Sequence, residues 1–400
     1  MKYIVLLGDG MADEPLDELG GKTPLEFART PRMDALAKAG ETGMMETVPK
    51  GYHPGSDVDN LSVFGYDPTV CYGGRSPLEA ASMGVDLASE DVAFRLNLVT
   101  ILPHYGKLYM EDFSAGHIAT EEARELIDCL EEELGGGEFR FYPGVSYRHL
   151  MVWKNGRDRL QFTPPHDLTH QSIENHLPKG DGADELINLM TSSQMLFNNH
   201  PVNLRRKMAG QLPANSIWLW GHGRAPHMES MRKKFGITGA VISAVDLIKG
   251  IGVCAGLDVI EVPGATGYID TNYVGKAEAA LDALKTRDFV YLHVEAPDEA
   301  AHAGNLEDKI AAIETFDEKV VGTVVDGLPA LGDYRVLVLP DHPTPVRKMT
   351  HTLDPVPYIL YGSGGEFPAV GRVSGYSEKQ ASATGIHLNR GHEMMKRFFS

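Results

Sequence analysis

The chain has 400 residues, which is enough for a large hydrophobic core and for two domains. Its formal net charge of −18 disfavours binding to nucleic acid or anionic membranes, so an anionic substrate would need local positive charge from metal ions or from a few Arg and Lys side chains. No apolar run is long enough to span a bilayer, and the 3 cysteines lack the close spacing of a zinc or redox motif, so we expect a cytoplasmic protein in a reducing compartment.

The N-terminal segment predicts a strand, a loop and a helix. Residues 3–7 form a short apolar run that is typical of a buried strand, and a Gly-Asp-Gly segment ends it. Thr30 and Pro31 predict the start of a helix, because threonine suits the N-cap and proline the first turn. Gly40 predicts the end of that helix.

The middle of the chain has a different sequence pattern. Short strand-like runs, such as residues 92–102 and 147–154, alternate there with loops rich in Pro, His and Gly. We interpret residues 81–229 as a smaller α+β domain, inserted into a core domain formed by residues 1–80 and 230–400.

The last third repeats the pattern of the first segment. Residues 288–294 and 334–339 are strand runs, and between them apolar residues recur at helical spacing over residues 306–328. Strands that alternate with helices indicate an α/β fold with a mostly parallel sheet flanked by helices.

Three of these strand runs are followed by a carboxylate. Asp9 comes after the first run, Asp298 after the run at 288–294, and Asp341 after the run at 334–339. In open α/β sheets, ligands bind beyond the carboxyl ends of the strands. A single aspartate there could be a turn or cap residue, but three of them predict a shared site.

Histidines accompany two of the three carboxylates. His302 follows Asp298 by four residues, which puts both on one face of a helical turn. His342 is next to Asp341, and His351 follows on a loop. Mixed Asp and His ligands suit Mn²⁺, Zn²⁺ or Mg²⁺, although with 16 histidines some Asp/His pairs also arise by chance.

Ser56 is the candidate nucleophile. Gly55 allows a sharp turn and a close approach of a phosphate, and a helix that starts at Ser56 would place its hydroxyl near free backbone N–H groups. Serine needs a base or a metal to become a good nucleophile, and the segment lacks a Gly-x-Ser-x-Gly elbow, so metal activation is the natural partner. The alternative is that Ser56 only caps the helix.

Taken together, these blocks resemble the cofactor-independent (2,3-bisphosphoglycerate-independent) phosphoglycerate mutases of the archaeal type, within the alkaline phosphatase superfamily. The resemblance runs nearly end to end. The blocks that carry it are Gly8-Asp9-Gly10, Thr23-Pro24-Leu25-Glu26, Gly55-Ser56-Asp57, Phe64-Gly65-Tyr66-Asp67-Pro68, Tyr147-Arg148-His149, the segment from Ala244 to Gly252, Gly264-Ala265-Thr266-Gly267-Tyr268, Asp270-Thr271-Asn272-Tyr273, the segment from Asp298 to His302, Asp341-His342 and His351-Thr352.

The resemblance implies a two-metal centre and a glycolytic isomerase. It implies two divalent ions, Mn²⁺ first, with Mg²⁺, Zn²⁺ or Co²⁺ as alternatives, and no 2,3-bisphosphoglycerate. A small phosphorylated metabolite would be the substrate. One ion would be held by Asp298, His302 and His351. The second would be held by Asp9, Ser56, Asp341 and His342.

The same resemblance implies the reaction steps. Ser56 would become phosphorylated, with Lys249 as the active-site lysine of the phosphatase-like core. The inserted domain would be the transferase-type domain that closes over the substrate, so that 3-phosphoglycerate and 2-phosphoglycerate interconvert through the phosphoserine.

One block departs from the archaeal pattern Asp-Arg-Arg-Ala-Gly-Arg. Residues 112–117 read Asp-Phe-Ser-Ala-Gly-His, which resembles a bacterial branch proposed to contain homoserine kinases. Phosphoryl transfer to another small metabolite is therefore the alternative function, and a metal-stabilised binding protein without turnover is a third. The candidate substrate contacts are Arg75, His117, Arg148 and His149.

Overall fold

The computed structural model describes residues 1–371 and 373–400. Contacts between residues divide the chain into two compact units, residues 1–72 with 227–400 and residues 73–226. The sequence predicted this division at residues 81 and 229. Each unit has its own hydrophobic core.

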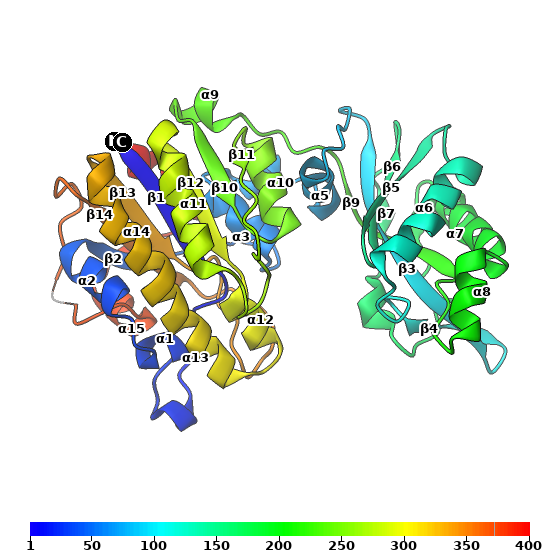
Figure 1. Cartoon of the computed structure of the whole chain (residues 1–400), viewed down its shortest axis with the longest axis horizontal. Coiled ribbons are helices and arrows are strands. Elements are labelled where there is room, and N and C mark those ends of the chain that lie inside the picture. Colours follow the sequence, from blue (N-terminus) through cyan, green and yellow to red (C-terminus); the bar gives the residue numbers. More distant parts are fainter. Residues whose placement is uncertain (372) are drawn as a thin grey trace. The chain divides into compact units, whose positions relative to one another are not determined.

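The larger unit contains a sheet of 8 strands in the order β11-β10-β12-β1-β13-β14-β2-β15 (Figure 1). Neighbouring strands are parallel, except that β14 is antiparallel to both β13 and β2. The strands are β1 (Lys2–Gly8), β2 (Glu41–Met45), β10 (Gly239–Ile242), β11 (Asp258–Val259), β12 (Phe289–Val294), β13 (Tyr334–Leu339), β14 (Val356–Gly362) and β15 (His387–Leu388).

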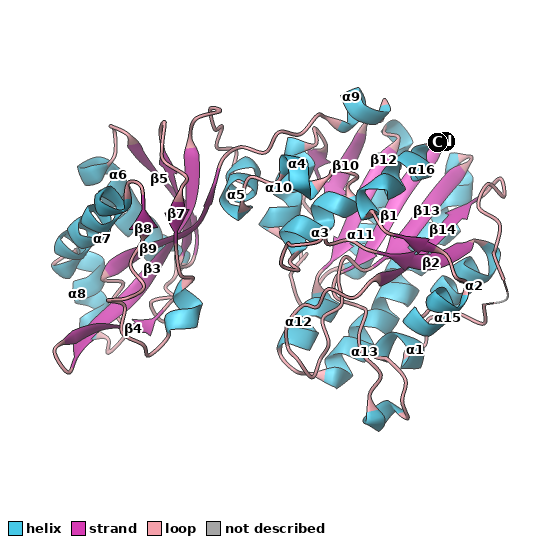
Figure 2. Cartoon of the chain, turned by 180° about the vertical axis from the view of Figure 1, so that it is seen from behind, coloured by secondary structure: helices cyan, strands magenta, loops and turns pink. Residues whose placement is uncertain are grey.

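Helices cover both faces of this sheet. On one face α11, α13 and α14 pack on apolar side chains of β1, β12 and β13 (Figure 1), and α3, α10 and α16 lie on the other face (Figure 2). The helices are α1 (Pro24–Phe27), α2 (Pro31–Ala39), α3 (Ser56–Val63), α4 (Pro68–Cys71), α9 (Met231–Phe235), α10 (Asp246–Cys254), α11 (Tyr273–Thr286), α12 (Ala296–His302), α13 (Leu306–Thr315), α14 (Gly322–Gly327), α15 (Glu378–Ala383) and α16 (Met394–Phe399). Short 3₁₀ turns span Asp17–Leu19, Leu328–Leu331 and Gly391–Glu393.

The predicted helix over residues 306–328 is continuous but contains a π-helical turn, Phe316–Val321, between α13 and α14. This turn places Asp317 at the start of α2, where its carboxylate accepts hydrogen bonds from the backbone N–H groups of Arg32 and Met33 at 3.1 and 2.7 Å. Thr30 is the N-cap residue, as predicted, but its side chain makes no capping hydrogen bond. Asp317 satisfies the free amides of α2 in its place.

The smaller unit is an antiparallel sheet with helices, a typical α+β arrangement. β3 is central and pairs with β4, β6 and β9, and β6 also pairs with β5. Its elements are α5 (Arg75–Ser82), β3 (Val92–His104), β4 (Lys107–Asp112), α6 (Thr120–Leu134), β5 (Phe139–Val145), β6 (Arg148–Trp153), β7 (Leu160–Gln161), a 3₁₀ turn at Pro165–Leu168, β8 (Lys179–Gly180), α7 (Ala183–Asn198), α8 (Pro201–Met208) and β9 (Ser216–Gly223).

These features confirm the predicted fold class: an α/β core with a mostly parallel sheet flanked by helices, and a smaller α+β part. Within the described residues, no helix combines the length and the apolar character that crossing a membrane requires.

Candidate metal centre

Three neighbouring strands bring the predicted carboxylates to one edge of the sheet. β1 lies between β12 and β13 and is parallel to both, with Gly8 opposite Val294 and Leu7 opposite Leu339. Because the three strands end at the same level, the segments that follow them converge. They carry Asp9, Asp341 and the helix α12, which contains Asp298 and His302.

A first group of potential ligands lies around Asp298. The ligand atoms of Asp298, His342 and His351 lie within 4.8 Å of one another. Nε2 of His302 lies 2.8 Å from Nε2 of His351 and 3.3 Å from Oδ2 of Asp298. Two imidazole nitrogens that face each other beside a carboxylate can share a proton or a cation.

A second group lies around Asp9. The ligand atoms of Asp9, His293 and Asp341 also lie within 4.8 Å of one another, and Nε2 of His293 is 2.8 Å from Oδ2 of Asp9. Nε2 of His342 lies 3.4 Å from Oδ1 of Asp9 and 3.4 Å from Oγ of Ser56. The predicted residues Asp9, Ser56, Asp341 and His342 therefore lie together, and His342 borders both groups.

Ser56 is the first residue of α3 and Gly55 is the N-cap, so of the two positions considered from the sequence Ser56 has the one inside the helix. One turn later, the side-chain amide of Asn60 donates hydrogen bonds to the carbonyl of Ser56 and to Oδ2 of Asp341 at 2.9 and 2.7 Å. Asn60 in turn accepts a hydrogen bond from the hydroxyl of Tyr291. This arrangement fixes the start of α3 against Asp341.

Negative charge accumulates at this edge. Burial, and then the nearby charges of Asp341 and Glu295, raise the pKa of Asp9 well above its usual value. Burial, and then Asp298, raise the pKa of Glu295 to about 8. Among the described residues, Oδ1 of Asp9 and Oε2 of Glu295 accept no hydrogen bond. Crowded buried carboxylates with unsatisfied oxygens, next to imidazoles, fit divalent cations well.

Two lysines approach this region. Lys249 in α10 forms an ion pair with Glu261, with Nζ at 2.8 and 3.0 Å from the two carboxylate oxygens. Lys276 in α11 is fully buried and donates to the backbone carbonyl of His293 at 3.1 Å, and burial lowers its pKa to about 8. The nearby charge of Glu295 raises the pKa of Lys276, and that of Lys249 lowers it.

Several neighbours of the site are absent from the sequence prediction: His293, Glu295, Lys276, Asn60 and Tyr291. His293 lies inside a strand whose neighbours are all buried, so its pattern is that of a core residue. Asn60 offers a usable signal, because it follows Ser56 by one helical turn. Nothing in the local sequence around Lys276 marks it as close to the strand ends.

The four predicted substrate contacts lie in the smaller unit. Arg75 forms an ion pair with Glu79, which also pairs with Arg95, and the guanidinium of Arg148 lies over the ring of Tyr147. His149 differs from the other three, because it is only 4% exposed and Nδ1 of its ring accepts the N–H of Gly144. Burial lowers the pKa of His149 to about 3, which keeps the ring neutral.

His117 lies in an unusual turn. Ala115, Gly116 and His117 are three consecutive residues with positive φ, at 49°, 66° and 50°. Asp112 holds this turn by accepting hydrogen bonds from the amides of Ser114 and Gly116 and from the Ser114 hydroxyl. The buried side chain of Arg206 donates a further hydrogen bond to the carbonyl of Ala115. Such strained backbone occurs preferentially at binding sites.

Aromatic rings surround the turn. Phe113 makes edge-to-face contacts with His117, Tyr147 and His166, and His166 makes one with Trp220. The guanidinium of Arg95 lies 4.2 Å from the centre of the Trp220 ring. The smaller unit thus has a face that combines arginines with aromatic and imidazole rings.

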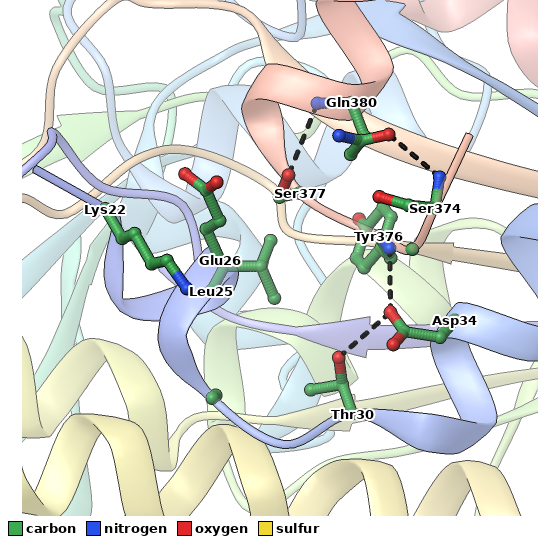
Figure 3. A pocket seen from close by; sticks show the side chains of 11 residues that line it. Lys22, Leu25, Glu26, Thr30, Asp34, Ser374, Tyr376, Ser377 and Gln380 are labelled. Carbon is green, nitrogen blue, oxygen red and sulfur yellow. Dashed lines mark hydrogen bonds between the residues drawn. The ribbon is translucent and has the colours of Figure 1, made fainter. Parts of the chain in front are cut away.

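A separate polar cavity of about 220 Å³ lies beside α1, α2 and the segment that leads into α15 (Figure 3). Asp34 accepts hydrogen bonds there from the Tyr376 amide and the Thr30 hydroxyl, and Gln380 accepts one from the Ser374 amide. The site residues predicted from the sequence all belong to the described part of the chain, and none of them lines this cavity.

Several known proteins are similar to this chain. A family model described as 2,3-bisphosphoglycerate-independent phosphoglycerate mutase matches residues 37–203. A probable 2,3-bisphosphoglycerate-independent phosphoglycerate mutase from Geobacter sulfurreducens is 63% identical over 396 residues, which cover 99% of each chain. The chain belongs to this family. The family predicted from the sequence blocks is therefore confirmed.

Two solved structures have the same fold as this chain. A protein from Pyrococcus horikoshii matches with a TM-score of 0.84 and 29% identity, covering 99% of this chain and 96% of that one. The cofactor-independent phosphoglycerate mutase from Thermoplasma acidophilum matches with a TM-score of 0.68 and 26% identity, covering 100% and 99% of the two chains.

Proposed function

We propose that this protein is a cytoplasmic, metal-dependent mutase that interconverts 3-phosphoglycerate and 2-phosphoglycerate through a phosphorylated Ser56. The observation that carries this proposal is the position of Ser56. Its hydroxyl lies at the N-terminus of α3 and 3.4 Å from His342, beside the buried carboxylates of a chain that belongs to the mutase family.

The donor set supports two divalent cations. Asp298, His302 and His351 would hold one ion, and Asp9, Ser56, Asp341 and His342 the other, with His293 beside Asp9 as a further candidate. Oxygen and imidazole donors suit Mn²⁺ first, and Mg²⁺, Zn²⁺ or Co²⁺ as alternatives. When bound, such ions lower the pKa of a nearby hydroxyl and offset the charge of a transferring phosphoryl group.

In the proposed reaction, Oγ of Ser56 forms a bond to phosphorus and the bond from phosphorus to the C3 oxygen of the substrate breaks. That oxygen takes up the proton that Ser56 loses, which leaves glycerate and phosphoserine. The C2 hydroxyl of glycerate then bonds to phosphorus while the bond from phosphorus to Oγ of Ser56 breaks, and Oγ takes up the proton that the C2 hydroxyl loses. The backbone N–H groups of Ser56 and Asp57 at the start of α3 would stabilise the phosphoryl oxygens throughout.

The smaller unit would hold the glycerate part of the substrate. Arg148 and His117 are exposed and Arg75 is partly exposed, and all three offer donors to a carboxylate. His149 is buried and neutral, and would act by supporting the backbone near Gly144. Glycerate must stay bound between the two transfers, because water would otherwise take the phosphoryl group.

A second candidate function is phosphoryl transfer to another small metabolite, homoserine being the named case. The observation in its favour is the turn at residues 112–117, where Phe113 and His117 place rings where the archaeal pattern has guanidinium groups. Rings cannot reproduce the bidentate contacts of arginine.

An enolase-coupled assay on the Mn²⁺-loaded protein tests the first proposal. We expect conversion of 3-phosphoglycerate, and a loss of at least about 10³-fold in Ser56→Ala. The matched control is Ser62→Ala, on the same helix, which we expect to keep the activity. A wild-type protein that does not convert 3-phosphoglycerate but phosphorylates homoserine with ATP would replace the first proposal by the second.

A further inference from the structure

The site contains one fully buried ion pair that the proposed reaction does not use. Nζ of Lys309, in α13, lies 2.7 Å from Oδ2 of Asp13, and both side chains are completely inaccessible to solvent. The two residues are 296 positions apart in the sequence.

Lys309 uses all three of its N–H groups. Besides the bond to Asp13, its Nζ donates to the backbone carbonyls of Thr344 and Ala12 at 2.8 and 3.2 Å. Asp13 in turn accepts the backbone N–H of Val346 at 3.0 Å through the same oxygen that binds Lys309. One ammonium group therefore joins the loop after β1 to the loop after β13.

Both loops carry candidate ligands. Asp9 lies four residues before Asp13, and Asp341 and His342 lie just before Thr344. The amide of Thr344 also donates to the carbonyl of Ala12 at 3.1 Å, which ties the two loops directly.

Thr344 transmits this arrangement to the ligands. Its hydroxyl donates to Oδ1 of Asp298 and lies 3.1 Å from Nδ1 of His342. A partner on the second ring nitrogen fixes the orientation of a ligating histidine, and loss of such partners typically weakens metal binding. Lys309, Asp13 and Thr344 thus fix the positions of the segments that follow β1, β12 and β13 relative to one another.

We infer that Lys309 and Asp13 are positioning residues, which hold the three ligand-bearing segments at the spacing that the metal ions require. The inference rests on the proposed metal sites and deepens them. A buried ion pair contributes little net stability compared with apolar side chains of similar size, because desolvation offsets the attraction. Its three contacts to the ligand loops therefore argue for a role in geometry.

The test measures Mn²⁺ binding to chelator-treated, full-length protein by titration calorimetry, without substrate. We expect Lys309→Met, which keeps most of the length of the side chain and removes its charge, to weaken binding by about 10- to 100-fold. With Co²⁺ in place of Mn²⁺, we expect the visible absorption bands of the bound ion to shift. A folded Lys309→Met protein with wild-type affinity and an unchanged Co²⁺ spectrum would overturn the inference.

Two further variants separate positioning from general stability. Thr344→Val keeps the shape of the side chain and removes the hydroxyl, so it tests the same route if Lys309→Met does not fold, and wild-type binding in this variant would also overturn the inference. Arg335→Met is the matched control, since Arg335 is a buried cation at the opposite end of β13 that bonds to Glu366 and to the carbonyl of Phe398. We expect it to lower Tm and to leave Mn²⁺ affinity unchanged.

The outcomes also separate this inference from the proposed function. A wild-type protein that binds Mn²⁺ but does not convert phosphoglycerate contradicts the mutase proposal, and the comparison with Lys309→Met still decides the positioning role. Equal Mn²⁺ binding by wild type and Lys309→Met contradicts the positioning role alone. A wild-type protein that binds no divalent cation contradicts both.

Discussion

The side-chain amide of Asn60 lies 2.7 Å from Oδ2 of Asp341, and the same group donates to the carbonyl of Ser56. Its oxygen accepts the hydroxyl of Tyr291, whose ring stacks on Phe64 at 3.8 Å. Asn60 thus connects the candidate nucleophile, a candidate ligand and the core of the sheet through one planar group.

We expect Asn60→Ala to lower kcat by about 10- to 100-fold, because Asp341 loses a partner that orients it. Stability should fall by about 1–3 kcal/mol, since the Tyr291 hydroxyl is left buried without a partner. The assay and a thermal melt check the two effects. Asn203→Ala is the control: Asn203 is equally buried in the smaller unit and bonds to Phe197 and Ala214. It should lose stability and keep kcat, and equal kcat losses in both variants would contradict the role of Asn60.

Metal removal should destabilise the protein. The buried carboxylate of Asp9 is repelled by those of Asp341 and Asp298 when no cation is bound. A ligand that binds only the folded state stabilises it by about 2.7 kcal/mol at 100 times its Kd. We therefore expect a chelator to lower Tm by several degrees and Mn²⁺ to restore it. In Asp298→Asn, Mn²⁺ should restore much less. A Tm that does not respond to chelator and Mn²⁺ would contradict a bound cation.

The sequence predicted the parts of the site that depend on local pattern. Apolar runs predicted β1, β12 and β13, so the three aspartates that follow these strands could be grouped from the order of residues alone. A helix start near Ser56 could also be considered from the sequence, with Ser56 either inside the helix or as its cap. Contacts between residues far apart in the sequence could not be predicted. Asp317, for example, replaces Thr30 as the hydrogen-bonding cap of α2, although it lies 285 and 284 residues after Arg32 and Met33, whose N–H groups it accepts. Lys309 meets Asp13 only because the strands lie side by side.

The antiparallel strand β14 shows a second limit. Its apolar run resembles that of β13, and strand direction depends on where the chain returns to the sheet rather than on the residues. His293 shows a third limit, because a polar side chain in a buried strand is marked as functional only by its partner, here Asp9. The histidines that follow strands, such as His342, are visible because loops carry function.

Replacing His117 by glycine should separate binding from stability. His117 has a φ of 50°, a conformation that costs a side chain about 1 kcal/mol and glycine little. We expect His117→Gly to keep or slightly raise Tm, while KM for phosphoglycerate rises about tenfold because a donor to the substrate is lost. The control is His104→Gly, at the exposed end of β3, which should leave KM unchanged. An unchanged KM in His117→Gly would exclude this ring as a substrate contact.

Asp317 should give the protein a pH-dependent stability outside the metal site. Burial raises the pKa of its carboxyl from 3.8 to about 6. The two backbone N–H groups of α2 favour the charged form and so oppose this increase, but burial has the larger effect. Because the folded-state pKa is the higher one, the stabilisation is complete below about pH 4 and is lost as the pH rises through about 6. Asp317→Asn should therefore remove part of the decrease in Tm between pH 4 and 6.

The matched control for this titration is Asp326→Asn. Asp326 is an exposed carboxylate in the neighbouring α14 that pairs with Arg32, close to the same end of α2. Melting curves at several pH values, recorded for both variants and the wild type with the same metal content, should show the slope reduced in Asp317→Asn alone. A slope that is the same in all three proteins, or reduced equally in both variants, would mean that Asp317 stays ionised over this range and caps α2 as a carboxylate.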